Sequence, residues 1–259
     1  MTYGLGLLLE EGLVLIGDTR TNAGIDNVSS YRKLHCLTQG PDREIYAICS
    51  GSLSASQAAI GMLLERHGAD GPARPLDGVA TMFAAAELVG AAVREANRRI
   101  GEALAPAKKA ASCFLLGGRI GDGPPRLFLI YEEGNFIECR ADVPYLQIGE
   151  TKYGRPILDR TIRRTTPLPA AVKIALLSFD SAMRSNLAVA CPLDLVVLPA
   201  DRAVPTYASR IEKDDPYFNQ LSARWSELLT EATLAIPDPS FMTRRESAPL
   251  SLVAEARIA

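Results

Sequence analysis

The chain has 259 residues, 47% of them hydrophobic and 22% charged, and a formal net charge of -2. This balance is typical of a globular protein, and the lack of a basic excess argues against nucleic-acid binding. The apolar runs are far shorter than the roughly 20 residues needed to cross a bilayer. The first residues show neither a basic region nor the cleavage site of a signal peptide. We therefore expect a cytoplasmic protein that binds neither membranes nor nucleic acid.

The cysteines are five in number, widely scattered, and without CxxC spacing. This pattern favours buried, reduced thiols over disulfides or a metal site. With only two histidines, a histidine-rich metal centre is not expected, and no metal or organic cofactor is predicted. The five are Cys36, Cys49, Cys113, Cys139 and Cys191.

The first fifty residues read as strands. Residues 3–9 and 13–18 are apolar, β-compatible runs that predict a hairpin turning at Gly12. Residues 33–37 and 44–50 are two more such runs, joined by the turn-forming stretch TQGPDR. We therefore expect one antiparallel meander of four strands.

The pattern then alternates between groups of helices and groups of strands. Helical spacing predicts helices at 52–68 and at the alanine-rich segment 80–104. Strands are then predicted at 112–119, 126–131, 136–140 and 145–148, helices at 153–164 and 169–185, a strand at 191–201, and an amphipathic helix at 215–234.

Runs of strands followed by runs of helices are typical of the α+β class rather than of βαβ units. The order suits two antiparallel sheets, each flanked by a helix pair, in a four-layer αββα sandwich. We expect one domain over residues 1–205 and a C-terminal helical extension with a tail over residues 206–259.

Thr2 is the first residue that could carry chemistry. Removal of Met1 would leave a free threonine whose α-amine, with a reference pKa near ~8, could accept the proton of its own hydroxyl. One residue would then supply both nucleophile and base. A threonine here is otherwise simply the second residue of the chain, but its place at the start of an apolar strand would hold such a terminus still.

Asp18, Lys33 and Gly51 could assist this threonine. The register of the predicted hairpin brings Asp18 near Thr2, and Lys33 begins the next strand. A lysine beside the hydroxyl and the amine would lower the pKa of both, and an aspartate would keep that lysine charged. The N–H of Gly51, at a helix start, could stabilise an oxyanion. The alternatives are an ordinary surface ion pair and a strand-to-helix turn glycine.

A polar cluster falls at the end of the helix 169–185. Asp180, Ser181 and Ser185 lie there, and Glu150 follows a predicted strand end. These side chains could steady the amine of Thr2. They could equally form a solvated helix terminus.

The start of the chain resembles that of proteasome β subunits. The spacing from Thr2 through Gly6, Gly12 and Asp18 to Arg20 matches that family without a gap. Lys33 and the residues around it resemble the segment that carries the family's catalytic lysine. The stretch SGSLSASQ resembles the turn that supplies the family's oxyanion hole. The segments DTRTNAGIDN, IGETKYG, DSAMRSN and DPYF resemble most closely the bacterial proteasome-like Anbu (ancestral β subunit) branch, over about nine-tenths of the chain.

The resemblance implies an N-terminal-nucleophile hydrolase in which Thr2 attacks an amide carbonyl. It implies that Asp180, with Ser181 or Ser185, orients the amine. Two positions depart from ordinary proteasome β subunits. Glu150 stands where a serine usually supports the threonine, and Met183 replaces a serine or threonine.

The resemblance also implies a substrate site and an assembly. Arg20, Thr21, Cys49 and Leu53 are expected to contact substrate, and the small, uncharged side chains among them favour an apolar residue at the cleavage position. We expect a threonine-type peptidase that acts on peptides or unfolded proteins within a homo-oligomeric ring or helical assembly. The helix bearing Trp225 and the segment 80–104 are candidate contact surfaces. The alternatives are an amidase of the same fold that acts on a small amide, and a catalytically silent assembly subunit.

Overall fold

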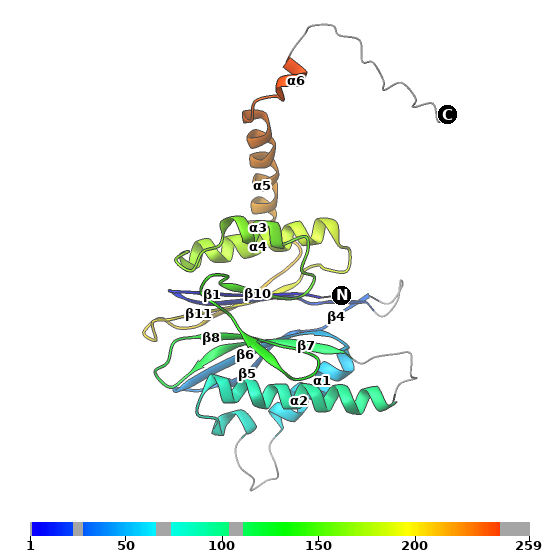
Figure 1. Cartoon of the computed structure of the whole chain (residues 1–259), viewed down its shortest axis with the longest axis vertical. Helices are drawn as coiled ribbons and strands as arrows, with labels where there is room; N and C mark the ends of the chain where they lie inside the picture. Colours follow the sequence, from blue (N-terminus) through cyan, green and yellow to red (C-terminus); the bar gives the residue numbers. More distant parts are fainter. Residues whose placement is uncertain (1, 23–27, 66–73, 104–110, 244–259) are drawn as a thin grey trace, which may run out of the picture.

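The computed structural model describes residues 2–22, 28–65, 74–103 and 111–243, which form four layers (Figure 1). Two β-sheets lie face to face in the middle, one helix pair covers each outer face, and a further helix projects from one of these pairs. The predicted αββα sandwich is therefore confirmed.

The sheet nearer the projecting helix has five antiparallel strands in the order β10-β1-β2-β11-β12. We call it sheet A. The strand nearest the N-terminus of the chain pairs with a strand on each side. The residue that precedes it is therefore held at the end of three hydrogen-bonded strands. The strands are β1 (Tyr3–Leu9), β2 (Gly12–Asp18), β10 (Tyr145–Gly149), β11 (Leu193–Pro199) and β12 (Tyr207–Ile211).

The second sheet, sheet C, is also antiparallel and has the order β5-β6-β7-β8-β9. Its strands are β5 (Leu34–Gln39), β6 (Arg43–Gly51), β7 (Ser112–Ile120), β8 (Arg126–Ile130) and β9 (Phe136–Glu138). A separate two-stranded ribbon is formed by β3 (Arg20–Asn22) and β4 (Val28–Ser30).

Helices α1 (Leu53–Leu64) and α2 (Met82–Ala103) cover sheet C, with the short helix η1 (Pro75–Gly78) between them in sequence. Helices α3 (Arg155–Thr161) and α4 (Leu168–Ser185) cover sheet A, and α5 (Pro216–Ala235) leads away from them to α6 (Ser240–Thr243). No helix in the described ranges combines the length and apolar character needed to cross a membrane.

Three apolar clusters fill the spaces between the layers. One packs Tyr3 and neighbouring strand residues of sheet A against Phe179 of α4. A second packs sheet C against the alanine-rich face of α2, and a third, around Leu15 and Leu115, joins the two sheets. The strands β1 and β2 are buried along their whole length, because each sheet has one face on a helix layer and the other on its neighbour.

Three features differ from the sequence prediction. The four-stranded meander is wrong, because β1–β2 and β5–β6 are hairpins of different sheets. The ribbon β3–β4 and the strand β12 were not predicted. Since β12 pairs with β11, residues beyond 205 belong partly to sheet A, and the projecting part begins only after Ile211.

The cysteines are free thiols, as predicted, but not all are buried. Cys49 and Cys139 are buried, Cys113 and Cys191 are half-buried, and Cys36 is exposed. Cys36 lies on β5, an edge strand of sheet C. Its neighbours in sequence are His35 and the buried Leu37, and its place on the edge strand leaves it open to solvent.

Candidate active site

Thr2 lies at the start of β1, between β2 and β10, and only 6% of its surface is exposed. Its carbonyl oxygen accepts a hydrogen bond of 2.6 Å from the backbone N–H of Glu150. Gly149 has φ +77°, and a Cβ there would lie 2.0 Å from the Thr2 carbonyl oxygen. Only glycine therefore fits this turn, which holds the backbone of Thr2 in place.

Asp18 and Lys33 form a buried ion pair beside this terminus. Lys33 Nζ donates to Asp18 Oδ1 at 2.9 Å and to the carbonyl oxygen of Arg20 at 2.5 Å. Asp18 Oδ1 also accepts the N–H of Tyr3 at 2.9 Å. The predicted hairpin register thus brings Asp18 to the start of β1, because Gly4 pairs with Gly17.

Burial dominates the electrostatics of this pair. Asp18 is fully buried and Lys33 is 4% exposed. Burial lowers the pKa of Lys33, although the charge of Asp18 opposes the change. Burial likewise raises the pKa of Asp18 against the effect of Lys33. Asp18 Oδ2 is buried and has no hydrogen-bond partner among the described residues.

Thr2 and Lys33 line one small pocket of about 60 Å³. Three of the four predicted substrate-binding residues, Thr21, Cys49 and Leu53, line it too, as does the predicted oxyanion residue Gly51. Ser50 and Ser56 complete the lining and were not predicted. Burial raises the pKa of the Cys49 thiol to about 11, so this wall of the pocket is uncharged at neutral pH.

Gly51 ends β6, two residues before α1 begins. Its φ is +96°, and a Cβ there would lie 2.1 Å from the carbonyl oxygen of Ala111. The side chain of Ser52 caps α1 by accepting from the N–H of Ala55. The positive end of a 12-residue helix therefore lies next to the pocket.

Arg20 does not line the pocket. Its Nη1 donates to the carbonyl oxygen of Leu187 at 2.7 Å, while its own carbonyl accepts from Lys33. The contact found for this predicted substrate-binding residue is thus with the loop that follows α4.

Asp180 and Ser181 lie on α4. The carboxylate of Asp180 accepts from the Ser222 hydroxyl of α5 at 2.6 Å and from Arg184 Nε at 3.0 Å. The hydroxyl of Ser181 has no hydrogen bond within the part of the chain that the structure describes. The contacts of Asp180 connect α4 to the projecting helix, and its predicted role at the amine stays a prediction.

Glu150 is buried and held by three donors. These are the N–H of Lys152 at 2.7 Å, the N–H of Tyr153 at 3.3 Å and the side-chain amide of Asn186 at 2.6 Å. Burial alone would raise the pKa of Glu150, but these hydrogen bonds outweigh it, and the pKa is lowered. Asn186 was not predicted as a site residue. Its place in DSAMRSN beside the polar cluster was the only signal.

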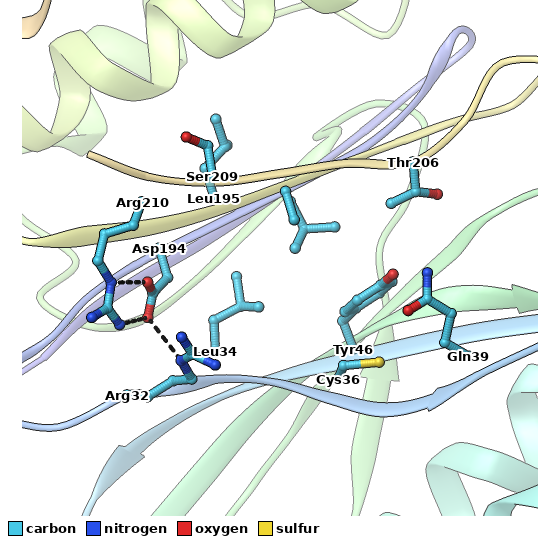
Figure 2. Close-up of a pocket in the computed structure, with 12 residues that line it drawn as sticks. Arg32, Leu34, Cys36, Gln39, Tyr46, Asp194, Leu195, Thr206, Ser209 and Arg210 are labelled. Atoms are coloured by element: carbon cyan, nitrogen blue, oxygen red, sulfur yellow. Dashed lines mark hydrogen bonds and ion pairs between the residues drawn. The ribbon is translucent and has the colours of Figure 1, made fainter.

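A groove of about 370 Å³ lies elsewhere, between the edge strands β5 and β12 (Figure 2). At one end, Arg210 makes two hydrogen bonds to Asp194, and Arg32 approaches the same carboxylate at 3.8 Å. None of the predicted site residues lines this groove. In the described ranges, no cluster of three or more histidine, cysteine or acidic side chains could hold a metal ion.

Several solved structures that resemble this chain are described as Anbu. Anbu from Hyphomicrobium sp. strain MC1 is 43% identical, with a TM-score of 0.82 over 92% of this chain and 99% of that one. Anbu from Yersinia bercovieri is 39% identical, with a TM-score of 0.84 over 92% and 98% of the two chains. The chain belongs to the Anbu family. No protein-family model and no curated protein matches it.

Anbu from Pseudomonas aeruginosa, described as a helical assembly, is 39% identical, with a TM-score of 0.86 over 93% of this chain and 99% of that one. Anbu proteins are ancestral β-subunit, proteasome-like proteins. The fold of the family, the N-terminal-nucleophile hydrolase sandwich predicted from the sequence, is the fold of this chain.

Proposed function

We propose that this chain is a threonine-type peptidase that acts with Thr2 as an N-terminal nucleophile after Met1 is removed. One observation supports it above the others. Thr2, Lys33 and Gly51 line the same small pocket, and Lys33 is held there by a buried carboxylate. A buried lysine of lowered pKa beside a buried hydroxyl is more typical of a reaction centre than of a surface ion pair.

The reaction follows from these positions. The Thr2 hydroxyl oxygen bonds to the carbonyl carbon of the substrate, and its proton passes to the α-amine of Thr2. The carbonyl oxygen becomes an oxyanion, which the N–H of Gly51 at the α1 N-terminus would stabilise. The C–N bond then breaks, and the leaving amine takes the proton from the α-amine. Water hydrolyses the remaining ester and restores Thr2.

Lys33 would act on this chemistry through its charge. Its ammonium lowers the pKa of the neighbouring hydroxyl and amine, which helps the hydroxyl lose its proton and keeps the amine neutral enough to accept it. Asp18 holds Lys33 in position. Asp180 and Ser181 are proposed to orient the amine. For Asp180 this requires a rearrangement of its contacts with Arg184 and Ser222.

We further propose that the chain works in the cytoplasm as a homo-oligomer, in a ring or a helical assembly, on peptides or unfolded proteins. The Pseudomonas aeruginosa relative is described as a helical assembly. The outer half of α5 is exposed on all sides, with Leu228, Leu229 and Leu234 open to solvent. Leucines this exposed within the part of the chain that the structure describes suit a contact with another copy.

Intact-mass measurement tests the proposal. The purified protein should lack Met1. After treatment with a peptide epoxyketone, a reagent that reacts with an N-terminal threonine, each chain should gain the mass of one reagent molecule. Thr2→Ala should fold and stay unlabelled. A mature chain that keeps Met1, or labelling that survives in Thr2→Ala, would refute the proposal.

The small volume of the pocket is also compatible with one alternative, an amidase that acts on a small amide, and this alternative can be tested. A pocket of about 60 Å³ admits only a small group, which also suits an amidase that acts on a small amide. Cleavage of unfolded casein into peptides supports the peptidase, whereas turnover of small acyl amides alone supports the amidase. A labelled enzyme excludes the third alternative, a silent assembly subunit.

A further inference from the structure

A second, larger cavity adjoins Thr2 on the β10 side. It measures about 560 Å³ and is lined by residues 149–153, at the end of β10 and beyond, and by residues 185–188, at the end of α4 and beyond. It shares no lining residue with the small pocket, whose walls come mainly from β6 and the start of α1. Its volume falls within the range of small-molecule binding sites, about 300–1,000 Å³.

Two of the lining residues touch Thr2 directly. Glu150 donates its N–H to the Thr2 carbonyl, and a Cβ on Gly149 would come within 3.3 Å of the Thr2 Cβ. Because β1 lies between β2 and β10, Thr2 has the Asp18–Lys33 pair on one side and this cavity on the other.

Leu187 and Tyr153 offer apolar surface to the cavity beside polar residues such as Lys152, and the loop that carries Leu187 is firmly held. The side chain of Leu187 is 85% exposed and that of Tyr153 is 45% exposed. An exposed leucine is usually mobile, but three bonds hold this loop. Arg20 binds the Leu187 carbonyl at 2.7 Å, Asn186 Nδ2 binds Glu150 at 2.6 Å, and Asn186 Oδ1 accepts from the N–H of Ala188 at 3.0 Å.

These bonds also connect the loop to the reaction centre. Lys33 donates to the carbonyl of Arg20, and the guanidinium of Arg20 fixes Leu187. Glu150 holds Asn186 with its side chain and Thr2 with its backbone. The loop is therefore held in a fixed position relative to Thr2 from two directions.

We propose that this cavity binds the leaving-group side of the substrate and that Leu187 and Tyr153 select an apolar residue directly after the cleaved bond. The inference rests on the proposed peptidase function. The acyl side of the substrate enters the small pocket beside Lys33, and the departing amine leaves toward β10. Burial of an apolar side chain against Leu187 and Tyr153 removes apolar surface from water on both partners.

Two quenched fluorescent peptides test the inference. They share one acyl side and differ only in the residue after the cleaved bond, which is leucine in one and serine in the other. Leu187→Ser and Tyr153→Ser should each lower kcat/KM for the leucine peptide about tenfold or more and leave the serine peptide nearly unchanged, as expected for one lost apolar contact. Val204→Ser, a residue 47% exposed in the loop between β11 and β12, should change neither.

Epoxyketone labelling separates the two proposals, because that probe occupies only the acyl side. Labelling of Thr2 should keep its rate in both variants. If wild-type protein neither labels nor cleaves, the peptidase proposal fails and this inference fails with it. If wild-type protein labels and cleaves but the variants affect both peptides equally, the peptidase stands and the selective cavity is refuted. If Leu187→Ser instead dissociates the assembly and lowers kcat/KM equally for both peptides, the loop is a contact between copies. That result would also refute the selective cavity.

Discussion

Lys33→Met should destabilise the fold strongly, because it removes the counter-charge of a fully buried carboxylate. Asp18 has no exposed surface, its Oδ2 has no partner among the described residues, and its Oδ1 would keep only the N–H of Tyr3. Breaking one partner of a buried ion pair costs about 3–5 kcal/mol. That is a large part of the total stability of a domain, about 5–15 kcal/mol.

The assay is urea unfolding of four proteins at pH 7: wild type, Lys33→Met, Asp18→Asn and the double variant. In the Asp18→Asn background the methionine should cost only about 1 kcal/mol, because no charge is left uncompensated. In Lys33→Met the pKa of Asp18 rises further above its unfolded value. The variant should therefore recover stability as pH falls and lose it as pH rises through the folded pKa.

A small effect would refute this reasoning. If Lys33→Met costs less than about 1 kcal/mol, or costs the same in both backgrounds, Asp18 is not a buried charge that depends on Lys33. Arg140→Met serves as the control, because Arg140 and its partner Asp142 are both exposed at a distance of 3.6 Å. That change should leave the unfolding midpoint nearly unchanged.

Three further predictions concern the surroundings of Thr2. Gly51→Ala should lower stability by about 1–3 kcal/mol and reduce epoxyketone labelling, because its Cβ would meet the Ala111 carbonyl at 2.1 Å in a left-handed conformation. The pKa of Glu150 is lowered, so its carboxylate should stabilise the fold at pH values above 4.5, the ordinary pKa of a glutamate. That contribution should be lost as pH falls through the lower pKa of the folded state. Wild type and Glu150→Gln should therefore converge in urea midpoint toward pH 3. Ser222→Ala should speed amide hydrogen exchange at the start of α5, because it removes the hydroxyl that binds Asp180.

Each of these has an outcome that contradicts it. Gly78→Ala is the control for Gly51, because its added Cβ would meet nothing within 4 Å, and equal losses in both would remove the steric argument. Glu150 would not be a stabilising carboxylate if the wild-type and Glu150→Gln midpoints stayed equally far apart from pH 7 to pH 3. Unchanged exchange in α5 after Ser222→Ala would mean that the Asp180 contact does not anchor the helix.

The local features of this protein could be predicted from its sequence. The β1–β2 hairpin follows from two apolar runs and a glycine turn, and its register brings Asp18 opposite the start of β1. A hairpin links residues close in the chain, so alternation and turn length are enough to define it. The order of strands and helices likewise indicated the four layers, because each element must cover an apolar face.

The tertiary structure decided what depends on contacts between distant segments. Only the sheet order shows that the first two hairpins belong to different sheets, and that β12 extends sheet A beyond residue 205. Only the folded chain shows that Arg20 reaches Leu187, 167 positions away, and that Asn186 reaches Glu150. Such pairings leave no periodic trace in the sequence, because either residue could take other partners until the packing of β10 and α4 brings the two segments together.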